Sequence, residues 1–142
     1  MTFSFSALAV ILLTSVVFDL YTKRLPNWLT LGAAVLGLAL STINGGVTLV
    51  NSLLGLLLAA AVGWSFWAAG MVGGGDHKLL MAVGALVGYP LILPVMLGIA
   101  LTGGVQAGLW IILKRQSWRG VPIPYSIAIA VGTLLVLVLK NF

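Results

Sequence analysis

The residues best suited to chemistry in this chain are two aspartates. Asp19 and Asp76 are the only acidic side chains among 142 residues, and the chain contains no cysteine. Thiolate nucleophiles, thiolate metal ligands and disulfides are therefore excluded. Asp76 follows three glycines, Gly73–Gly75, which would let an extended peptide backbone approach the carboxylate closely. Glycines before a helix also expose backbone N–H groups that could hold an oxyanion.

Two carboxylates can act together or separately. A close pair shares one proton, because like charges a few ångströms apart resist joint ionisation; one group then activates water while the other polarises a carbonyl. The pair could instead bind a cation or relay protons, as in small transporters. A purely structural alternative pairs Asp19 with Lys23 or Arg24. It also pairs Asp76 with Lys78, and the residue types alone leave all three possibilities open.

The composition excludes a soluble globular fold. Hydrophobic residues make up 61% of the chain and charged residues only 6%, and the mean hydropathy is +1.21. A soluble domain carries about 25% charged residues, so this chain would leave a soluble surface mostly apolar. The same apolar excess excludes disorder. The formal net charge of +5 is interpreted as a topology signal, and no nucleic-acid partner is expected.

We predict an all-α polytopic membrane protein with a single domain over residues 1–142. Turn-forming sequences divide the chain into about six transmembrane helices. The predicted spans are Thr2–Tyr21, Asn27–Ile43, Val47–Gly70, Asp76–Gly88, Leu91–Leu113 and Ile123–Leu139. The fourth span is short for a crossing, so we expect it to start or end inside the protein. Asn27, directly after Pro26, is expected to cap the second helix.

The basic residues predict the orientation in the membrane. If both termini lie outside the cytosol, six of the seven basic residues fall on the cytosolic side, as the positive-inside rule expects. The six are Lys23, Arg24, Lys78, Lys114, Arg115 and Arg119, and the seventh is Lys140. This topology places Asp19 and Asp76 at the same depth beside the cytosolic face. Small residues at four-residue spacing predict close helix packing at Gly55/Ala59/Gly63, Gly84/Gly88 and Gly104/Gly108.

Two segments resemble the motifs of a known family. The sequence D-L-Y-T-K-R-L-P-N over residues 19–27 resembles the first motif of the type IV prepilin peptidase family. The sequence G-G-G-D-H-K-L over residues 73–79 resembles its second motif, G-x-G-D-x-K-L. The order and spacing of the helices are also similar, so the resemblance covers nearly the whole chain.

The resemblance implies a membrane aspartic endopeptidase that needs no metal or cofactor. Such an enzyme removes the short basic leader of prepilins or pseudopilins at the cytosolic face of a prokaryotic inner membrane. Asp19 and Asp76 would form the catalytic pair. The other motif residues expected near the substrate are Gly73, Gly75, Lys78, Pro26 and Asn27. The expected partners are the substrate helix and membrane lipid, and the oligomeric state stays open.

The chain departs from larger members of this family in two ways. It has no cysteines and no room for their cysteine-containing insert, so it resembles the short, peptidase-only branch associated with Flp (tight-adherence) pili. N-methyltransferase activity is therefore not expected. His77 fills a slot where the family usually carries a small aliphatic residue, either to tune an aspartate or as an interfacial filler.

Some interpretations remain open at this point. Lys78 could pair with Asp76, contact lipid headgroups or attract an acidic substrate residue. The segment P-I-P-Y over residues 122–125 resembles a family segment near the site, although it could simply start a helix with Tyr125 anchored at the interface. The rival functions are a small proton- or cation-coupled transporter and a non-catalytic factor in pilus or secretion assembly.

Overall fold

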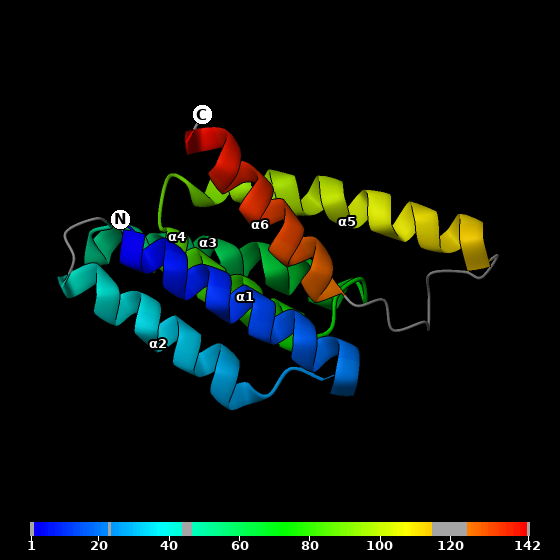
Figure 1. Ribbon diagram of the computed structural model, residues 1–142, viewed down its shortest axis with the longest axis horizontal. Coiled ribbons are helices and arrows are strands. Elements are labelled where there is room, and N and C mark those ends of the chain that lie inside the picture. The colour runs from blue at the N-terminus through cyan, green and yellow to red at the C-terminus, as the bar shows by residue number, and fades with distance from the viewer. Residues whose placement is uncertain (1, 23, 44–46, 115–124, 142) are drawn as a thin grey trace.

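The computed structural model describes residues 2–22, 24–43, 47–114 and 125–141, which form six α-helices and no strand. The helices are α1 (Thr2–Thr22), α2 (Asn27–Ile43), α3 (Leu49–Ala68), α4 (Gly74–Val87), α5 (Ile92–Lys114) and α6 (Tyr125–Asn141). Figure 1 shows α1 to α4 side by side in one group, with α6 running diagonally beside it and α5 extending to the right along the upper side. The predicted all-α bundle of six helices is confirmed within these ranges.

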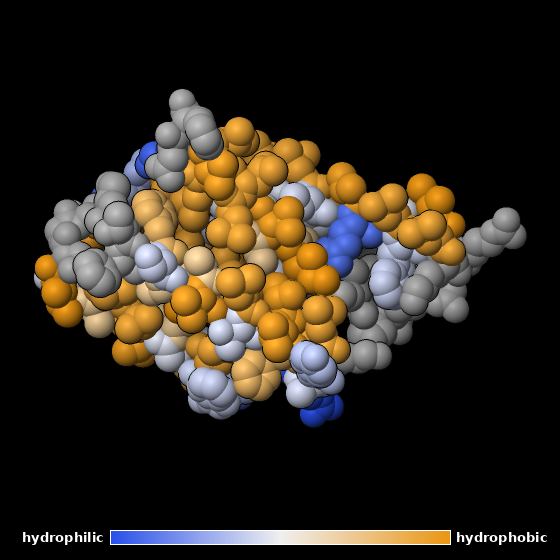
Figure 2. All heavy atoms as spheres, viewed as in Figure 1, coloured by the Kyte–Doolittle hydropathy of each residue, from blue (hydrophilic) through white to orange (hydrophobic). Residues whose placement is uncertain are grey.

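Three of the helices are long and apolar enough to cross a membrane. They contain the segments Phe5–Thr22, Leu49–Ala68 and Ile92–Leu113, and the shorter apolar helices are Asn27–Ile43 and Tyr125–Lys140. Large hydrophobic side chains such as Leu57 and Leu101 are more than half exposed. Hydrophobic residues cover most of the face in Figure 2. Exposing so large an apolar surface to water is unfavourable, whereas lipid can cover it. The protein is therefore a multi-pass membrane protein.

Helix α4 lies at the centre of the bundle. It packs most extensively against α3 and α2, and it also contacts α1, α5 and α6. Every residue from Leu79 to Gly88 except Met81 is buried, which suits a helix that is apolar on all sides. Gly88 ends the helix with a φ of +71°, a conformation that favours glycine. With 14 residues, α4 is about 21 Å long, shorter than the hydrocarbon core of about 30 Å.

Small residues bring α3 and α4 together, as predicted. A Cβ atom added to Gly55 would lie 2.8 Å from the Gly88 Cα atom. One added to Gly84 would lie 2.7 Å from the Ala59 Cβ atom. Gly63 continues this face and lies against the His77 ring of α4. The predicted stripe on these two helices is thus confirmed as a close helix–helix contact.

The same prediction is wrong for Gly104 and Gly108, where no atom of the described residues lies within 4 Å of an added Cβ. Helices α5 and α6 meet instead at Gly98 and Gly132. A Cβ atom added to Gly98 would lie 2.7 Å from Val136 Cγ2 and 2.9 Å from the Gly132 carbonyl oxygen. Four-residue spacing identifies a helix face with small side chains, but not whether another helix covers that face.

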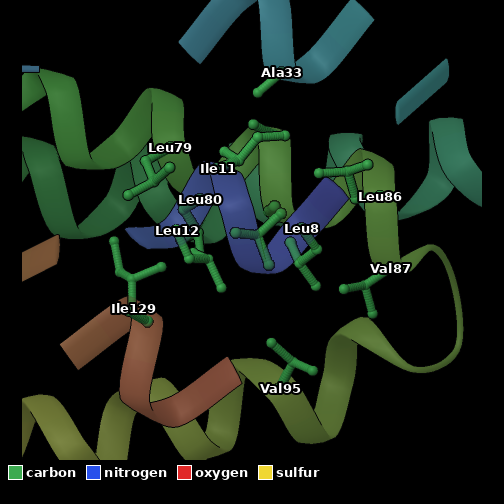
Figure 3. Close-up of a cluster of buried hydrophobic side chains, with 14 of the residues drawn as sticks. Leu8, Ile11, Leu12, Ala33, Leu79, Leu80, Leu86, Val87, Val95 and Ile129 are labelled. Atoms are coloured by element: carbon green, nitrogen blue, oxygen red, sulfur yellow. The ribbon is translucent and has the colours of Figure 1, made fainter. Parts of the chain in front are cut away.

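In the hydrophobic core, α1 packs against both α4 and α6. Figure 3 shows Leu8 and Leu12 of α1 among side chains of α4, with Ile129 of α6 and Val95 of α5 nearby. These four side chains are at most 1% exposed. The core therefore fixes α1 and α4, the two helices that carry the aspartates, relative to one another.

Consecutive helices run in alternating directions between the two ends of the bundle. Both labelled termini lie at the left-hand end of Figure 1, and the α1–α2 and α3–α4 connections lie at the right-hand end. Helix α2 starts at Asn27 itself, and the Leu29 N–H donates to the Pro26 carbonyl oxygen. The prediction that Asn27 caps this helix is therefore wrong: Asn27 is the first residue of the helix, and its side-chain oxygen accepts a hydrogen bond from Lys78. The predicted start of the sixth span, Ile123, lies outside the described residues.

Candidate active site

Asp19 belongs to the buried face of α1. The residues Leu8, Leu12, Ser15 and Asp19 follow one another at spacings of four, three and four, so they share one side of the helix. All four are buried, and Asp19 is 9% exposed. Its Oδ2 atom accepts a hydrogen bond of 2.5 Å from the Ser126 hydroxyl on α6. The last turn of α1 thus directs a carboxylate into the bundle.

Asp76 lies in the first turn of α4. Gly73, the residue directly before α4, has an extended backbone (φ −71°, ψ 157°) and provides no side-chain cap. The Gly73 backbone N–H donates a hydrogen bond to the Asp76 carboxyl group. The Asp76 Oδ1 atom is buried and has no hydrogen-bond partner among the described residues. A buried carboxyl oxygen without a donor is costly when charged, so this environment favours the protonated acid.

The two aspartates line the same cleft. This aspartate cleft has a volume of about 300 Å³, and its lining residues are Asp19, Arg24, Leu25, Gly73, Gly74, Gly75 and Asp76. It lies where α1 ends and α4 begins, at the end of the bundle opposite both labelled termini (Figure 1). The expected co-location of the two carboxylates at one end of the bundle is therefore present in the fold.

The environment of Asp76 differs from that of an ordinary surface carboxylate. Asp76 lies outside the apolar spans and shorter apolar helices described above. Burial raises the pKa of Asp76 to about 7, the negative charge of Asp19 acts in the same direction, and the Gly73 hydrogen bond opposes them. Near neutral pH the cleft can therefore hold one proton on Asp76, as a carboxyl pair that shares a proton requires.

Lys78 and Asn27 connect the two motifs directly. The Lys78 ammonium donates a hydrogen bond of 2.7 Å to the Asn27 Oδ1 atom. This contact ties the start of α4 to the start of α2, and it differs from the Lys78–Asp76 ion pair of the structural alternative. Pro26 supplies the carbonyl oxygen that accepts the first hydrogen bonds of α2. Lys23, which with Arg24 was a proposed partner of Asp19, lies outside the described residues.

The glycines of the second motif differ in what they permit. A Cβ atom added to Gly75 would lie 3.0 Å from the Leu25 Cβ atom, so Leu25 would have to move. A Cβ atom added to Gly73 would make an ordinary contact of 3.5 Å with Asp76 Oδ2. Gly75 thus packs closely against the first motif, and a side chain there would displace Leu25, whereas the space around Gly73 admits a Cβ atom.

His77 is directed toward α3. Its ring lies edge-on to Trp64, with centroids 6.4 Å apart, and its Nδ1 atom is buried without a hydrogen-bond partner among the described residues. Burial and the Lys78 charge lower the pKa of His77. These contacts place the ring between α3 and α4, as the filler interpretation expects, and His77 does not line the aspartate cleft.

Two residues at the start of α6 approach the aspartates. Tyr125 and Asp76 both line a second, small pocket of about 30 Å³ whose other residues are mostly apolar. Tyr125 therefore lies near the site, whereas Pro122 and Pro124 of the same segment lie outside the described residues. Ser126 was not predicted from the sequence. A serine inside an apolar helix carries no motif, and only the fold reveals its contact with Asp19.

The fold and the cleft define a class: a multi-pass helical membrane protein with an aspartate pair at one end of its bundle. The chain belongs to the type IV leader peptidase family, whose model matches residues 6–108. The matched region includes both aspartates. No solved structure matches the chain.

Curated relatives agree with this assignment. The chain is similar to the prepilin leader peptidase/N-methyltransferase of Xanthomonas campestris, with 36% identity over 122 residues, 80% of this chain and 42% of that relative. It is 34% identical over 137 residues to the corresponding protein of Aeromonas hydrophila, 88% of this chain and 47% of that relative. It is also 32% identical over 81 residues to the preflagellin peptidase of Methanococcus voltae, 54% of this chain and 34% of that relative. The chain spans about half the length of the first two relatives.

Proposed function

We propose that this chain is a membrane aspartic endopeptidase that removes the leader peptide of a prepilin-like substrate. The observation that carries the proposal is the aspartate cleft, which is lined by the only two acidic side chains of the sequence, one from α1 and one from α4. The names of the relatives, prepilin leader peptidase and preflagellin peptidase, indicate the substrate class. The proposal concerns the peptidase reaction only.

The position of the cleft suits such a substrate. A prepilin-like chain combines an apolar helix with a short basic leader, so its scissile bond lies near the membrane boundary. The cleft lies at the ends of α1 and α4, and the neighbouring glycines Gly73 and Gly74 are exposed. We infer that the leader reaches the cleft from the cytosolic face of a prokaryotic inner membrane, while the substrate helix stays in the lipid.

The proposed reaction is general acid–base hydrolysis. One carboxylate takes a proton from water, whose oxygen attacks the scissile carbonyl carbon. The protonated partner donates a proton to the carbonyl oxygen. The C–N bond then breaks as the carboxyl group that took the water proton passes it to the leaving amine, and the other carboxylate regains its proton from the new carboxyl group. Burial of Asp76, which raises its pKa to about 7, supports its availability as a proton-carrying member of the pair.

The two rival functions have less support. A coupled transporter needs a polar path through the bundle, and its ion sites tend to lie near the membrane midplane. The aspartate cleft lies instead at one end of the bundle, and the pocket on the other side of Asp76 is lined mainly by apolar residues such as Leu80 and Ile99. A non-catalytic assembly factor gives no reason to bury the two acids in one cleft.

The proposal is tested by co-expression with a prepilin-like substrate. Leader removal is followed by the mass of the substrate for the wild type, Asp19→Asn and Asp76→Asn. We expect each Asn variant to reduce cleavage by at least about 100-fold, because each removes one partner in proton transfer. Lys140→Gln is the control, since it removes one charge from the last turn of α6, at the other end of the bundle. Normal cleavage by either Asn variant at normal protein level would end the proposal.

A further inference from the structure

Ser126 makes a contact with the candidate site that the sequence motifs do not include. It is fully buried, and its hydroxyl donates to Asp19 Oδ2 across 107 positions of sequence. It is the second residue of α6, and the family match ends at residue 108. The contact is therefore visible only in the folded structure and not in the sequence motifs.

We propose that Ser126 is a positioning residue that holds the Asp19 carboxylate through Oδ2 and leaves Oδ1 for the reacting water. Asp19 then acts as the base of the pair, and Asp76 acts as the proton donor. This inference rests on the proposed peptidase function, and it adds both a residue and an assignment of roles.

The hydrogen bonds of the two aspartates differ in the way this assignment requires. Asp19 Oδ2 accepts a hydrogen bond from the buried Ser126 hydroxyl, and this contact fixes the orientation of the Asp19 carboxyl group. Asp76 Oδ1 is buried and has no donor among the described residues, an environment that suits a protonated oxygen. Each carboxyl group thus accepts one hydrogen bond, Asp19 from Ser126 and Asp76 from the Gly73 N–H. The asymmetry lies in the second oxygen of Asp76, which is buried without a partner among the described residues.

The start of α6 is itself held firmly in place. The Thr102 hydroxyl of α5 lies within hydrogen-bond distance of the Ala128 carbonyl oxygen, two residues after Ser126, at 2.9 Å, and at the same distance from the Gly98 carbonyl oxygen of its own helix. The close packing of Gly98 against Gly132 holds the two helices together further along. The Ser126 hydroxyl is therefore supported by α5 and can fix the orientation of Asp19 within the tolerance that catalysis needs.

A merely structural role for Ser126 is the alternative to be excluded. In that case the hydrogen bond would only fasten α6 to α1, and its loss would reduce stability without a specific effect on the chemical step. Ser52 provides a matched control. It is also fully buried, and its hydroxyl also joins two helices, donating 2.5 Å to the Ala85 carbonyl oxygen. Neither Ser52 nor Ala85 lines the aspartate cleft.

The experiment measures kcat and KM of the purified full chain in detergent with a prepilin-like substrate, together with the thermal midpoint of each variant. We expect Ser126→Ala to lower kcat about tenfold to hundredfold with KM nearly unchanged, because misorientation of a catalytic group affects the chemical step. Ser126→Thr, which keeps a hydroxyl, should recover most of the activity. Ser52→Ala should lose stability without this selective loss of kcat.

The outcomes separate this inference from the function on which it rests. If the wild type cleaves and folded Ser126→Ala cleaves equally well, the positioning role is wrong and the peptidase proposal stands. Equal losses of kcat in Ser126→Ala and Ser52→Ala would also overturn it. If Ser126→Ala fails to fold, Ser126→Thr decides: activity near that of the wild type supports the role, and a loss as large as that of Asp19→Asn contradicts it. If the wild type cleaves no substrate, the proposed function itself is wrong.

Discussion

At the scale of single residues, the account depends on the unequal environments of Asp19 and Asp76. Asp19 accepts a hydrogen bond from a buried hydroxyl, whereas Asp76 has a buried oxygen without a donor among the described residues. Both side chains line one cleft. Two chemically identical groups can therefore take different roles because their neighbours differ.

The first prediction concerns pH. Burial raises the pKa of Asp76 to about 7, so this carboxyl is protonated below that pH and ionised above it. If Asp76 donates the proton, the single-turnover rate of cleavage should fall above pH 7 by about tenfold per pH unit. The rate is measured from pH 6 to 8.5 on the purified chain. A rate that stays constant over this range would contradict the assignment.

Infrared spectroscopy provides a control that needs no substrate. The C=O stretch of a protonated carboxyl should titrate with a midpoint near pH 7 in the wild type and be absent in Asp76→Asn. In Asp19→Asn the midpoint should move to lower pH, because the Asp19 charge is one cause of the raised pKa. An unchanged midpoint would show that the two carboxyl groups do not interact.

The sequence was sufficient to identify both aspartates as candidate site residues, because they are the only acidic residues and lie in two recognisable motifs. It was not sufficient to identify Ser126 or the Lys78–Asn27 contact. Those two contacts join residues 107 and 51 positions apart. Such pairings depend on how whole helices pack, and local spacing carries no information about them.

At the scale of helices, the site depends on the contact that holds α4 in the bundle. Helix α4 carries Asp76, and it meets α3 at Gly55 and Gly84 with almost no space between the backbones. Side-chain packing alone would leave the helix axes further apart. The position of Asp76 therefore depends in part on glycines far from the cleft.

The second prediction tests this contact. Gly55→Ala adds a methyl group 2.8 Å from the Gly88 Cα atom, so it should reduce the free energy of unfolding by about 1–3 kcal/mol. Gly104→Ala is the matched control, because an added Cβ meets nothing within 4 Å, and it should leave stability unchanged or slightly raised. The comparison is made by chemical unfolding in detergent micelles. Equal effects of the two substitutions would contradict the close approach.

At the scale of the whole molecule, the alternation of helix ends defines two sides. Arg24 and Lys78 lie at the same end as the aspartates, and Lys140 lies at the other end with both labelled termini (Figure 1). Lys23, Arg115 and Arg119 lie outside the described residues. The positive-inside rule predicts that the aspartate end faces the cytosol.

The third prediction concerns this orientation. The sequence has no cysteine, so a single introduced cysteine is a unique label. Lys140→Cys should react with an impermeant maleimide in intact cells, because the predicted topology places the end of α6 outside the cytosol. Met71→Cys, at an exposed position in the α3–α4 connection, should react only after the membrane is opened. The reverse pattern would place the aspartate cleft on the outer face.

Hydrophobic runs and turn residues predicted the six helices to within about two residues at most ends. The second helix has the predicted bounds Asn27–Ile43, and the fourth is Gly74–Val87 where Asp76–Gly88 was expected. Which glycine face meets another helix could not be predicted, as Gly104 and Gly108 show. Small residues on a helix serve both close packing and open surface, and only the arrangement of the helices distinguishes the two.

The most direct test of the central claim is hydrolysis by the purified chain in water enriched in ¹⁸O. A prepilin-like substrate is incubated with the wild type, Asp19→Asn or Asp76→Asn, and both products are measured by mass spectrometry. The account predicts that the wild type releases the leader with one ¹⁸O atom in its new carboxyl group, and that neither variant releases it. Release of the leader by both variants at the wild-type rate would contradict the claim that these two aspartates hydrolyse the peptide bond.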